Sequence, residues 1–281
     1  HYSGLTVAQM QTLRRQMAEA GLLALNLPQE YGGVGLPLLD TLLLIQTIQR
    51  VDSTLGGLSH RTSTGAIGAV LELGTEEQKR RFVTGVARGE IGVSIGITEP
   101  DAGSAATAMK TKARIEGDEV VISGQKRVIR AAKANHYTML YCRFGNTGRA
   151  SDIGAVMVPH DAPGFSCSNG TLNMAGERQY ELYFDECRVP RANILAESRA
   201  FAKLISVYNA ERLGSISRML GSAQLQFGWA RLVSRTRTSR RRGSTTSSHP
   251  VKPVCPKVAG EDRRPMNHGW SMAKPSPGVA K

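Results

Sequence analysis

Two short segments of the chain carry residue types that suit chemistry better than packing. The first, residues 97–104, has the sequence ITEPDAGS, which combines hydroxyl side chains with a glycine whose backbone no side chain covers. Hydroxyl groups and bare N–H groups in one loop can bind the edge of a flavin ring or a pyrophosphate. An ordinary turn at the entrance to a sheet is the alternative interpretation, because short motifs of this kind often occur without function.

The second segment places one carboxylate on a predicted helix. Residues 209–213 have the sequence NAERL. Neighbours at i+3 and i+4 spacing form one stripe on this helix: Leu204, Tyr208, Glu211, Ser215, Arg218 and Ser222. A carboxylate on a partly apolar face has a raised pKa, which suits a general base at neutral pH. A solvated glutamate is the alternative, since the adjacent Arg212 points away from Glu211.

Helical spacing dominates the chain before these segments. From about residue 5 to residue 90, apolar residues recur at the period of a helix, and the Gly- and Pro-rich residues 27–35 interrupt them. The sequence TEEQ at residues 75–78 has the form of a capping box that opens a helix. We therefore expect an amino-terminal helical domain over residues 1–90.

Short β-rich runs follow, separated by turn residues. They cover residues 112–115, 119–122, 137–144, 153–158 and 181–184, and EGD at residues 116–118 supplies a tight hairpin turn. No helical pattern alternates with these strands, which favours an antiparallel sheet or a small barrel over residues 91–195.

Helical spacing returns after Pro190. Residues 201–229 have the pattern of one long helix, which we expect to be the first helix of a carboxy-terminal helical domain over residues 196–230. The predicted fold class is therefore α+β, with an amino-terminal helical domain, a middle antiparallel β domain and the start of a second, truncated helical domain.

Charge and composition limit the classes of function. Residues 231–281 hold 12 Lys and Arg against 2 Asp and Glu, most of the net charge of +13, so the rest of the chain is close to neutral. The four cysteines and six histidines lack the paired spacing of a metal site, and we expect reduced thiols and no metal. The sequence has neither a membrane-spanning stretch nor a signal core, and it starts without Met, as an internal segment would. A cytoplasmic protein is expected.

The basic residues 231–281 have too few apolar side chains to bury a core, and we expect them to be disordered or non-native. Three origins are open: a reading-frame shift near Arg231, which we favour because the change is abrupt, a genuine basic tail, or a fusion scar. A disordered basic tail can also bind nucleic acid through its phosphates, although Trp270 is the only aromatic residue in it.

Four phrases together resemble the acyl-CoA dehydrogenase family. They are residues 21–33, residues 74–79, the ITEPDAGS loop, and residues 182–190 followed by NIL at 193–195. The resemblance implies FAD as cofactor and dehydrogenation of an acyl-CoA thioester to the 2,3-enoyl-CoA. It also implies an electron-transfer flavoprotein as acceptor, and a homodimer or homotetramer in an intact version. A non-catalytic relative that binds nucleic acid through the tail is the second hypothesis.

The resemblance implies roles for individual residues. Thr98 would hydrogen-bond the flavin ring and Ser104 its phosphates. The other expected flavin contacts are Ile97, Gly103, Val128 and Ile129. The expected contacts to the thioester are Ser104, Tyr208 and Arg212. Glu211 would be the base that removes the α-proton, as in a subgroup similar to isovaleryl-CoA and long-chain dehydrogenases.

One segment departs from the pattern of the family. Residues 127–132 have the sequence RVIRAA, so that Val128 stands where the family usually has an aromatic residue. The hydroxyl residue expected after Ile129 is missing, and the loop is one residue short. The closing helices of the family are not recognisable after Ala230. These departures predict weak or absent flavin binding, low activity, and an exposed apolar stripe on the helix at 201–229.

Overall fold

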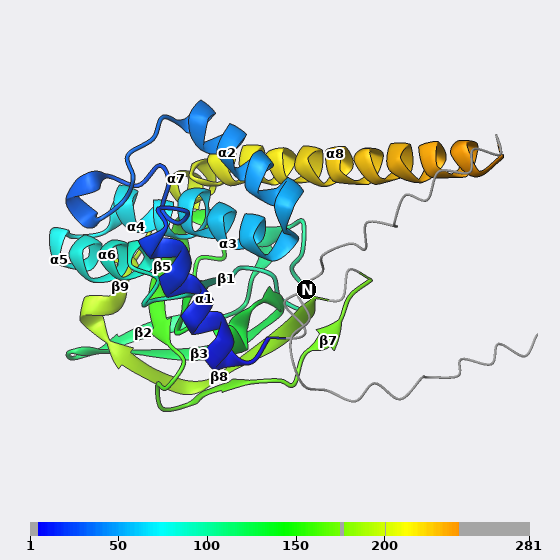
Figure 1. Cartoon of the computed structure of the whole chain (residues 1–281). Coiled ribbons are helices and arrows are strands. Elements are labelled where there is room, and N and C mark those ends of the chain that lie inside the picture. Colours follow the sequence, from blue (N-terminus) through cyan, green and yellow to red (C-terminus); the bar gives the residue numbers. More distant parts are fainter. Residues whose placement is uncertain (1–4, 175–176, 200, 242–281) are drawn as a thin grey trace, which may run out of the picture. The chain divides into compact units, whose positions relative to one another are not determined.

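The computed structural model describes residues 5–174, 177–199 and 201–241, with side chains as far as residue 234. The chain divides into two compact units, His1–Arg235 and Thr236–Lys281, and the elements described here belong to the first, apart from the last turns of the final helix. Within this first unit, helices lie on one side of a β-sheet (Figure 1).

The amino-terminal helices begin where the sequence supplies caps. Thr6 and Gln9 form a capping box at the start of α1, and Thr75 and Gln78 form the predicted one at the start of α5. The helical elements of this domain are α1 (Val7–Glu19), η2 (Gln29–Tyr31), α2 (Leu38–Val51), α3 (Ser53–Thr64), α4 (Ile67–Leu73), α5 (Glu76–Gln78), η3 (Lys79–Val83) and α6 (Thr84–Ala87). The predicted helical domain is confirmed.

The middle domain is built on one sheet. Its strands are β1 (Val93–Gly96), β2 (Lys112–Glu116), β3 (Glu119–Arg130), β4 (Tyr137–Arg143), β5 (Ile153–Pro159), β6 (Phe165–Cys167), β7 (Thr171–Leu172), β8 (Arg178–Pro190) and β9 (Ile194–Ala196). Their order is β6-β8-β3-β2-β4-β5-β9, with β1 beside β4 and β7 beside β8. The expected tight turn at residues 116–118 connects β2 to β3 as a hairpin, in which Glu116 lies opposite Glu119.

The sheet is mixed rather than purely antiparallel, which corrects the prediction. β1 runs parallel to β4, with Val93 opposite Tyr137, and β2 meets β4 in one parallel pair. The chain reverses once at the β2–β3 hairpin and again between β3 and β4, so that β4 runs in the direction of β1 and β2. The remaining pairs are antiparallel among the described strands.

Two β-bulges distort the pairing of β3 with β8. One places Glu186 of β8 at a φ of 47°, and the other places Val128 of β3 at a φ of 62°. Residues other than glycine rarely adopt positive φ, and a β-branched residue there is an outlier. The second bulge falls in the segment where the sequence departs from the family pattern.

Strand β4 separates the two apolar clusters of the core. Met139 and Tyr141 belong to the cluster beneath the helices, whereas Leu140 and Cys142 belong to the cluster on the opposite face of the sheet. Successive side chains of a strand point to opposite faces, and all four are fully buried. β4 is therefore covered on both sides, which explains the run of four apolar residues at 139–142.

Two helices replace the single helix predicted after the sheet. α7 (Phe201–Ser206) and α8 (Tyr208–Arg241) are separated at Val207. α8 continues beyond Ala230, where the sequence had suggested an end, because each added residue of adequate helix propensity extends an existing ladder of hydrogen bonds. The rest of the predicted basic tail, residues 242–281, lies outside the described residues.

Small residues allow α8 to approach the amino-terminal helices. A Cβ atom at Gly214 would collide with the ring of His60 on α3, and one at Gly221 would lie 2.5 Å from the carbonyl oxygen of Gln46 on α2. A hydrogen bond from Nε2 of Gln49 to the hydroxyl oxygen of Ser222, 3.0 Å long, adds to this contact. The outer face of α8 is exposed and apolar, as predicted: Leu213, Ile216, Met219, Leu220, Phe227 and Trp229.

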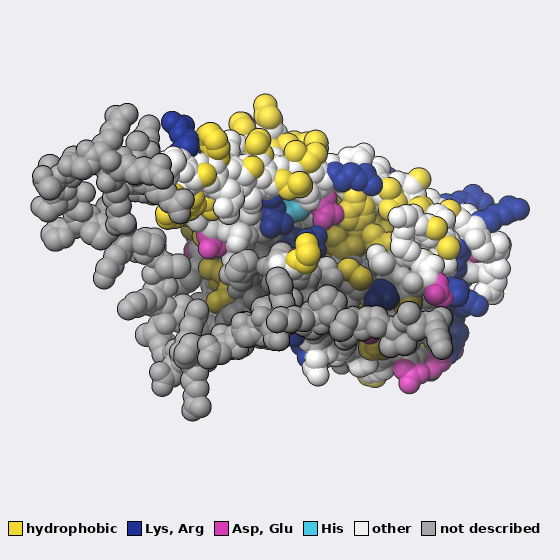
Figure 2. All heavy atoms as spheres, turned by 90° about the vertical axis from the view of Figure 1, so that its right-hand side faces the viewer, with side chains coloured by type: hydrophobic (Ala, Val, Ile, Leu, Met, Phe, Trp, Pro, Cys, Tyr) yellow, Lys and Arg dark blue, Asp and Glu magenta, His cyan; other side chains and the backbone are white. Residues whose placement is uncertain are grey.

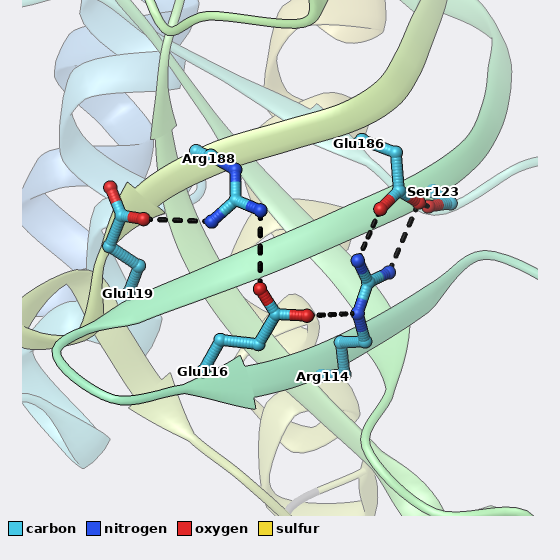
Figure 3. Close-up of polar contacts among 6 residues, drawn as sticks. All are labelled: Arg114, Glu116, Glu119, Ser123, Glu186 and Arg188. Carbon is cyan, nitrogen blue, oxygen red and sulfur yellow. Dashed lines mark hydrogen bonds and ion pairs between the residues drawn. The ribbon is translucent and has the colours of Figure 1, made fainter.

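An exposed network of ion pairs crosses three adjacent strands of the sheet, β2, β3 and β8. Arg114 on β2 pairs with Glu116 and Glu186, and Arg188 on β8 pairs with Glu116 and Glu119 (Figure 3). Exposed pairs contribute little individually, but this network links β2, β3 and β8 and engages Glu186 at its bulge. It therefore supports the register of the sheet rather than a binding site.

Two further properties concern the described chain as a whole. None of the helices that the structure describes is long and apolar enough to cross a membrane. Cys142, Cys167 and Cys187 are free thiols, and Cys255 lies outside the described residues.

Candidate active site

A buried ion pair fixes the ITEPDAGS loop against the sheet. The side chain of Lys126 on β3 is fully buried, and its Nζ donates to the carbonyl oxygen of Ile97 at 2.9 Å and to the Glu99 carboxylate at 2.8 Å. Glu99 also accepts from the Thr111 hydroxyl at 2.6 Å and from the N–H groups of Lys110 and Thr111. Burial alone would raise the pKa of Glu99, but Lys126 and these donors hold it below its usual value. These hydrogen bonds therefore hold the first residues of the loop in a fixed position against the sheet.

The donors expected to hold FAD lie at the open end of this loop. The carbonyl oxygen of Thr98 accepts from the N–H of Arg127 at 2.9 Å, which places Thr98 beside the bulge of β3. Thr98 is half-buried, Ser104 is exposed, and no described atom lies within 4 Å of where a Cβ at Gly103 would stand. A flavin edge and phosphates require hydrogen-bond donors. Thr98 supplies a hydroxyl beside the sheet, Gly103 an open backbone and Ser104 a second hydroxyl, so the loop fits FAD.

The expected flavin contacts on β3 point in different directions. Val128 is 47% exposed on the bulge, whereas Ile129 is 3% exposed and packs into the sheet core opposite Tyr180. Arg130, which occupies the position of the missing hydroxyl residue, is exposed at the end of the strand. An isopropyl group and a guanidinium therefore stand where the family has an aromatic ring and a hydroxyl.

Glu211 lies half-buried in the first turn of α8. Its burial raises its pKa, and the positive charges of Arg130, Arg212 and Arg61 oppose this shift in part. The direction is the one predicted for a general base. Because Arg130 ends β3, the carboxylate interacts electrostatically with the strand that carries the expected flavin contacts.

His60 of α3 ties Glu211 to the helical domain. The Nε2 atom of His60 lies 3.1 Å from the main-chain carbonyl oxygen of Glu211, and the ring is 1% exposed. Burial lowers the pKa of His60 to about 4 in spite of this hydrogen bond. The ring is therefore neutral at physiological pH and donates from Nε2. The sequence analysis considered the six histidines only as possible metal ligands, so this role of His60 was missed.

The two expected thioester contacts on α8 have different surroundings. Tyr208 is half-buried against the core, with its hydroxyl oxygen 3.1 Å from that of Tyr141. Burial raises the pKa of Tyr208 well above its usual value. Arg212 is exposed, and its Nη1 donates to the Oδ1 atom of Asn209 at 2.8 Å. Arg130 thus acts on Glu211 through its charge. Tyr208 is half-buried and packs against the core, whereas Arg212 lies at the surface.

A cavity of about 320 Å³ lies where α1 and α3 meet the end of β3 and the start of β8. Its charged wall consists of Arg61, Arg130, Lys133, Glu177 and Arg178. Figure 2 shows a hollow on this side of the molecule in which basic side chains gather with an acidic side chain and a histidine. One feature of the sequence pointed to this region, the missing hydroxyl at position 130. No pattern in the sequence marked Arg61, which only the fold places in the same cavity wall as Arg130.

Two family models match the chain. They are the acyl-CoA dehydrogenase N-terminal domain over residues 6–90 and the acyl-CoA dehydrogenase middle domain over residues 94–187. Acyl-CoA dehydrogenase FadE12 of Mycobacterium tuberculosis is 32% identical over 220 residues, which cover 76% of this chain and 56% of that protein. The 3-sulfinopropanoyl-CoA desulfinase of Advenella mimigardefordensis is 31% identical over 221 residues, which cover 75% of this chain and 55% of that protein.

A solved structure shows the same fold. A glutaryl-CoA dehydrogenase from Mycobacterium smegmatis in complex with FADH2 superposes with a TM-score of 0.68 and 24% identity, over 76% of this chain and 55% of that one. The chain spans about half the length of the curated relatives it matches. Both domain models match in consecutive order, and a helix that carries Glu211 follows them. The chain belongs to the acyl-CoA dehydrogenase family.

Proposed function

We propose that this chain carries the FAD site and the base of an enzyme that oxidises acyl-CoA thioesters to 2,3-enoyl-CoA. The observation that supports this most directly is Glu211, a half-buried carboxylate with a raised pKa that interacts with the end of β3. That strand carries the bulge beside Thr98. A base and the donors expected to hold FAD are therefore linked through one strand.

The chemical roles follow from these surroundings. The Glu211 carboxylate accepts the proton from the α-carbon of the thioester. FAD, when bound, accepts the hydride that leaves the β-carbon. Burial raises the pKa of Glu211, and the charges of Arg130, Arg212 and Arg61 limit this rise, which favours the ionised carboxylate that a base requires. His60 holds the main chain of Glu211 in place through its carbonyl group.

Thr98, Gly103 and Ser104 would hold the cofactor through their hydroxyl and backbone donors. Val128 offers less contact area than the aromatic residue usual in the family, so affinity for FAD should be lower than in an intact relative. Impaired turnover of this chain, an electron-transfer flavoprotein as acceptor, assembly into a homodimer or homotetramer, and a cytoplasmic location remain predictions.

The nucleic-acid hypothesis has no observation that favours it. It depends on the basic residues of the tail, and residues 242–281 lie outside the described part of the chain. We therefore retain dehydrogenation as the proposed function.

The test is a spectroscopic one on the purified chain. After incubation with FAD and removal of free cofactor, acyl-CoA thioesters added without oxygen should bleach the flavin band, slowly if the chain is impaired. Glu211→Gln should keep the bound flavin and slow the bleaching by at least about 100-fold. Glu77→Gln, at an exposed glutamate far from this site in the sequence, is the matched control and should behave as the parent. Bound flavin that no thioester bleaches would refute the proposal.

A further inference from the structure

We propose that the outer face of α8 binds a second copy of this chain, and that the two helices pair in antiparallel directions. This inference concerns assembly and does not depend on the proposed function. It follows from the spacing of the apolar residues on that face, from the way their sizes match across a two-fold axis, and from the distribution of charge along the helix.

The apolar residues of the outer face repeat with the period of a seam between two helices. At alternating steps of three and four residues, α8 carries Leu213, Ile216, Leu220, Ala223, Phe227 and Ala230, which we call the outer stripe. All six are exposed, and the four larger side chains are between 44% and 65% exposed. A repeat of this kind keeps one side of a helix facing a partner helix over several turns.

The opposite face of α8 is occupied by the amino-terminal helices. Gly214 and Gly221, which are also seven residues apart, let α8 approach α3 and α2. The side chain of Gln49 on α2 donates to the Ser222 hydroxyl at 3.0 Å and accepts from Nε of Arg218 at 3.1 Å. Figure 1 shows α8 lying beside α2 and continuing past it. The outer stripe therefore faces away from the protein's own core.

The side chains of the outer stripe match in size when two copies pair antiparallel. A two-fold axis between residues 221 and 222 gives three kinds of layer, in which Leu220 lies opposite Ala223, Ile216 opposite Phe227, and Leu213 opposite Ala230. Two of these layers combine a leucine with an alanine, so that large and small side chains interdigitate. A parallel pair would set each residue against its own copy, and alanine facing alanine would leave a gap.

The distribution of charge also favours the antiparallel pair. Residues 231–241 of α8 hold five arginines and no acidic residue, whereas the outer stripe holds no charge. A parallel pair would bring the two basic ends together and align the two helix dipoles. An antiparallel pair places the basic ends at opposite ends of the seam, so this repulsion is avoided.

A lipid surface fits the outer stripe less well than a second helix does. Ser217, Gln224 and Gln226 border the stripe with polar side chains, which keeps it narrow. A helix that lies in a membrane surface presents a basic, polar face to water, but the face of α8 opposite the stripe is packed against α2 and α3. The narrow stripe is typical of a seam between two helices.

Sedimentation velocity of the full chain over a range of concentrations measures the assembly. We expect a reversible dimer with twice the mass of the chain. Ile216→Glu and Phe227→Lys should each weaken association at least about 100-fold, because each would bury a charge without a partner. Leu172→Glu, at an exposed leucine of β7, is the matched control and should leave the dimer unchanged. Circular dichroism establishes that each variant is folded.

Mixing the two variants tests the direction of the pair. In an antiparallel pair, a chain with Ile216→Glu places its carboxylate opposite position 227 of the second copy, where Phe227→Lys supplies the matching charge. The mixture should therefore form a heterodimer, although each variant alone stays monomeric. In a parallel pair the two positions lie about 16 Å apart along the helix, and the mixture should gain nothing.

Each outcome supports or overturns the proposal. A parent dimer, two monomeric variants and a heterodimer in their mixture would support it. A parent that is monomeric at every concentration, or a dimer that survives both substitutions, would overturn it. Loss of the dimer in Leu172→Glu would show unspecific apolar association, and a mixture that stays monomeric would overturn the antiparallel direction. A monomeric parent whose binding to vesicles of phosphatidylcholine and phosphatidylglycerol is lost with Ile216→Glu would show that the stripe binds lipid instead.

Discussion

The Nε2 atom of His60 lies 3.1 Å from the main-chain carbonyl oxygen of Glu211, so a buried histidine of the amino-terminal domain holds the turn of α8 that carries the candidate base. The first turns of a helix are easily frayed unless the surrounding structure restrains them. Gly214 allows this contact, because a side chain there would collide with the ring of His60. The position of Glu211 therefore depends on a residue far from it in the sequence.

Removal of this ring should weaken both the fold and the site. His60→Ala leaves the Glu211 carbonyl without its donor and opens a cavity in the core, and we expect a loss of about 2–4 kcal/mol in the free energy of unfolding. His60→Gln, whose amide can still donate, should recover part of it. Urea denaturation measures both. Equal losses for the two variants would show that packing alone, and not the hydrogen bond, accounts for the effect.

Two buried histidines should make the protein sensitive to mild acid. Burial lowers the pKa of His60 and of His160 to about 4, below the 6.5 of an exposed histidine. As the pH falls below 6.5 the unfolded chain takes up protons that the folded chain excludes, so stability is complete above pH 6.5 and is lost progressively towards pH 4. The slope should approach about 1.4 kcal/mol per pH unit for each histidine.

Chemical denaturation at a series of pH values measures this slope. The double variant His60→Gln, His160→Gln should show a flatter dependence in the same window. Glu186, whose pKa the hydrogen bonds from Arg114 and Ser123 lower to about 2, acts in the same direction only at lower pH. An unchanged slope in the double variant would show that other groups dominate the acid response.

Val128 should be replaceable by glycine with a gain in stability. Its φ of 62° costs an L-residue about 1–2 kcal/mol, whereas glycine adopts it freely and loses about 0.5–1 kcal/mol through greater freedom in the unfolded chain. The half-exposed side chain contributes little burial, so we expect Val128→Gly to stabilise by up to about 1 kcal/mol. Arg127→Gly, next to it without positive φ, should destabilise. Thermal melting compares the stabilities of the two variants. Equal destabilisation by Val128→Gly and Arg127→Gly would contradict the prediction that the backbone at Val128 is strained.

The buried pair beneath the ITEPDAGS loop should respond unequally to single and double replacement. Lys126→Met leaves the Glu99 carboxylate buried without its cation, and we expect a loss of about 3–5 kcal/mol. Adding Glu99→Gln removes the unpaired charge and should restore a large part of it. Affinity for FAD, measured by fluorescence quenching, should fall with Lys126→Met because the loop loses its anchor. Additive effects of the two substitutions would argue against direct coupling.

Local features were predictable from the sequence, and long-range ones were not. The capping box at Thr75 and the hairpin at residues 116–118 depend on neighbouring residues, so their patterns predicted them. The parallel pairing of β1 with β4 depends on how the intervening hairpin is placed, which no local pattern encodes.

The same distinction applies to the site. Glu211 stood out because its neighbours at helical spacing form a stripe, and the ITEPDAGS loop because of its composition. Arg61 and Arg130 come from α3 and β3 and meet only in the folded protein. The missing hydroxyl at position 130 was visible in the sequence, but the effect of the arginine in its place on the charge of Glu211 follows only from the fold.

The parallel pairing of β1 with β4 has a consequence for the order in which the parts of the sheet fold. β1 has no neighbour in the sheet other than β4 among the described strands, and β4 is synthesised only after the β2–β3 hairpin. Pairings between distant segments form slowly, because the entropy lost in closing the loop between them comes before any contact that compensates for this loss. The rate-limiting step of folding should therefore be the pairing of β4 with β1, and substitutions in β4 should slow refolding more than those in α1.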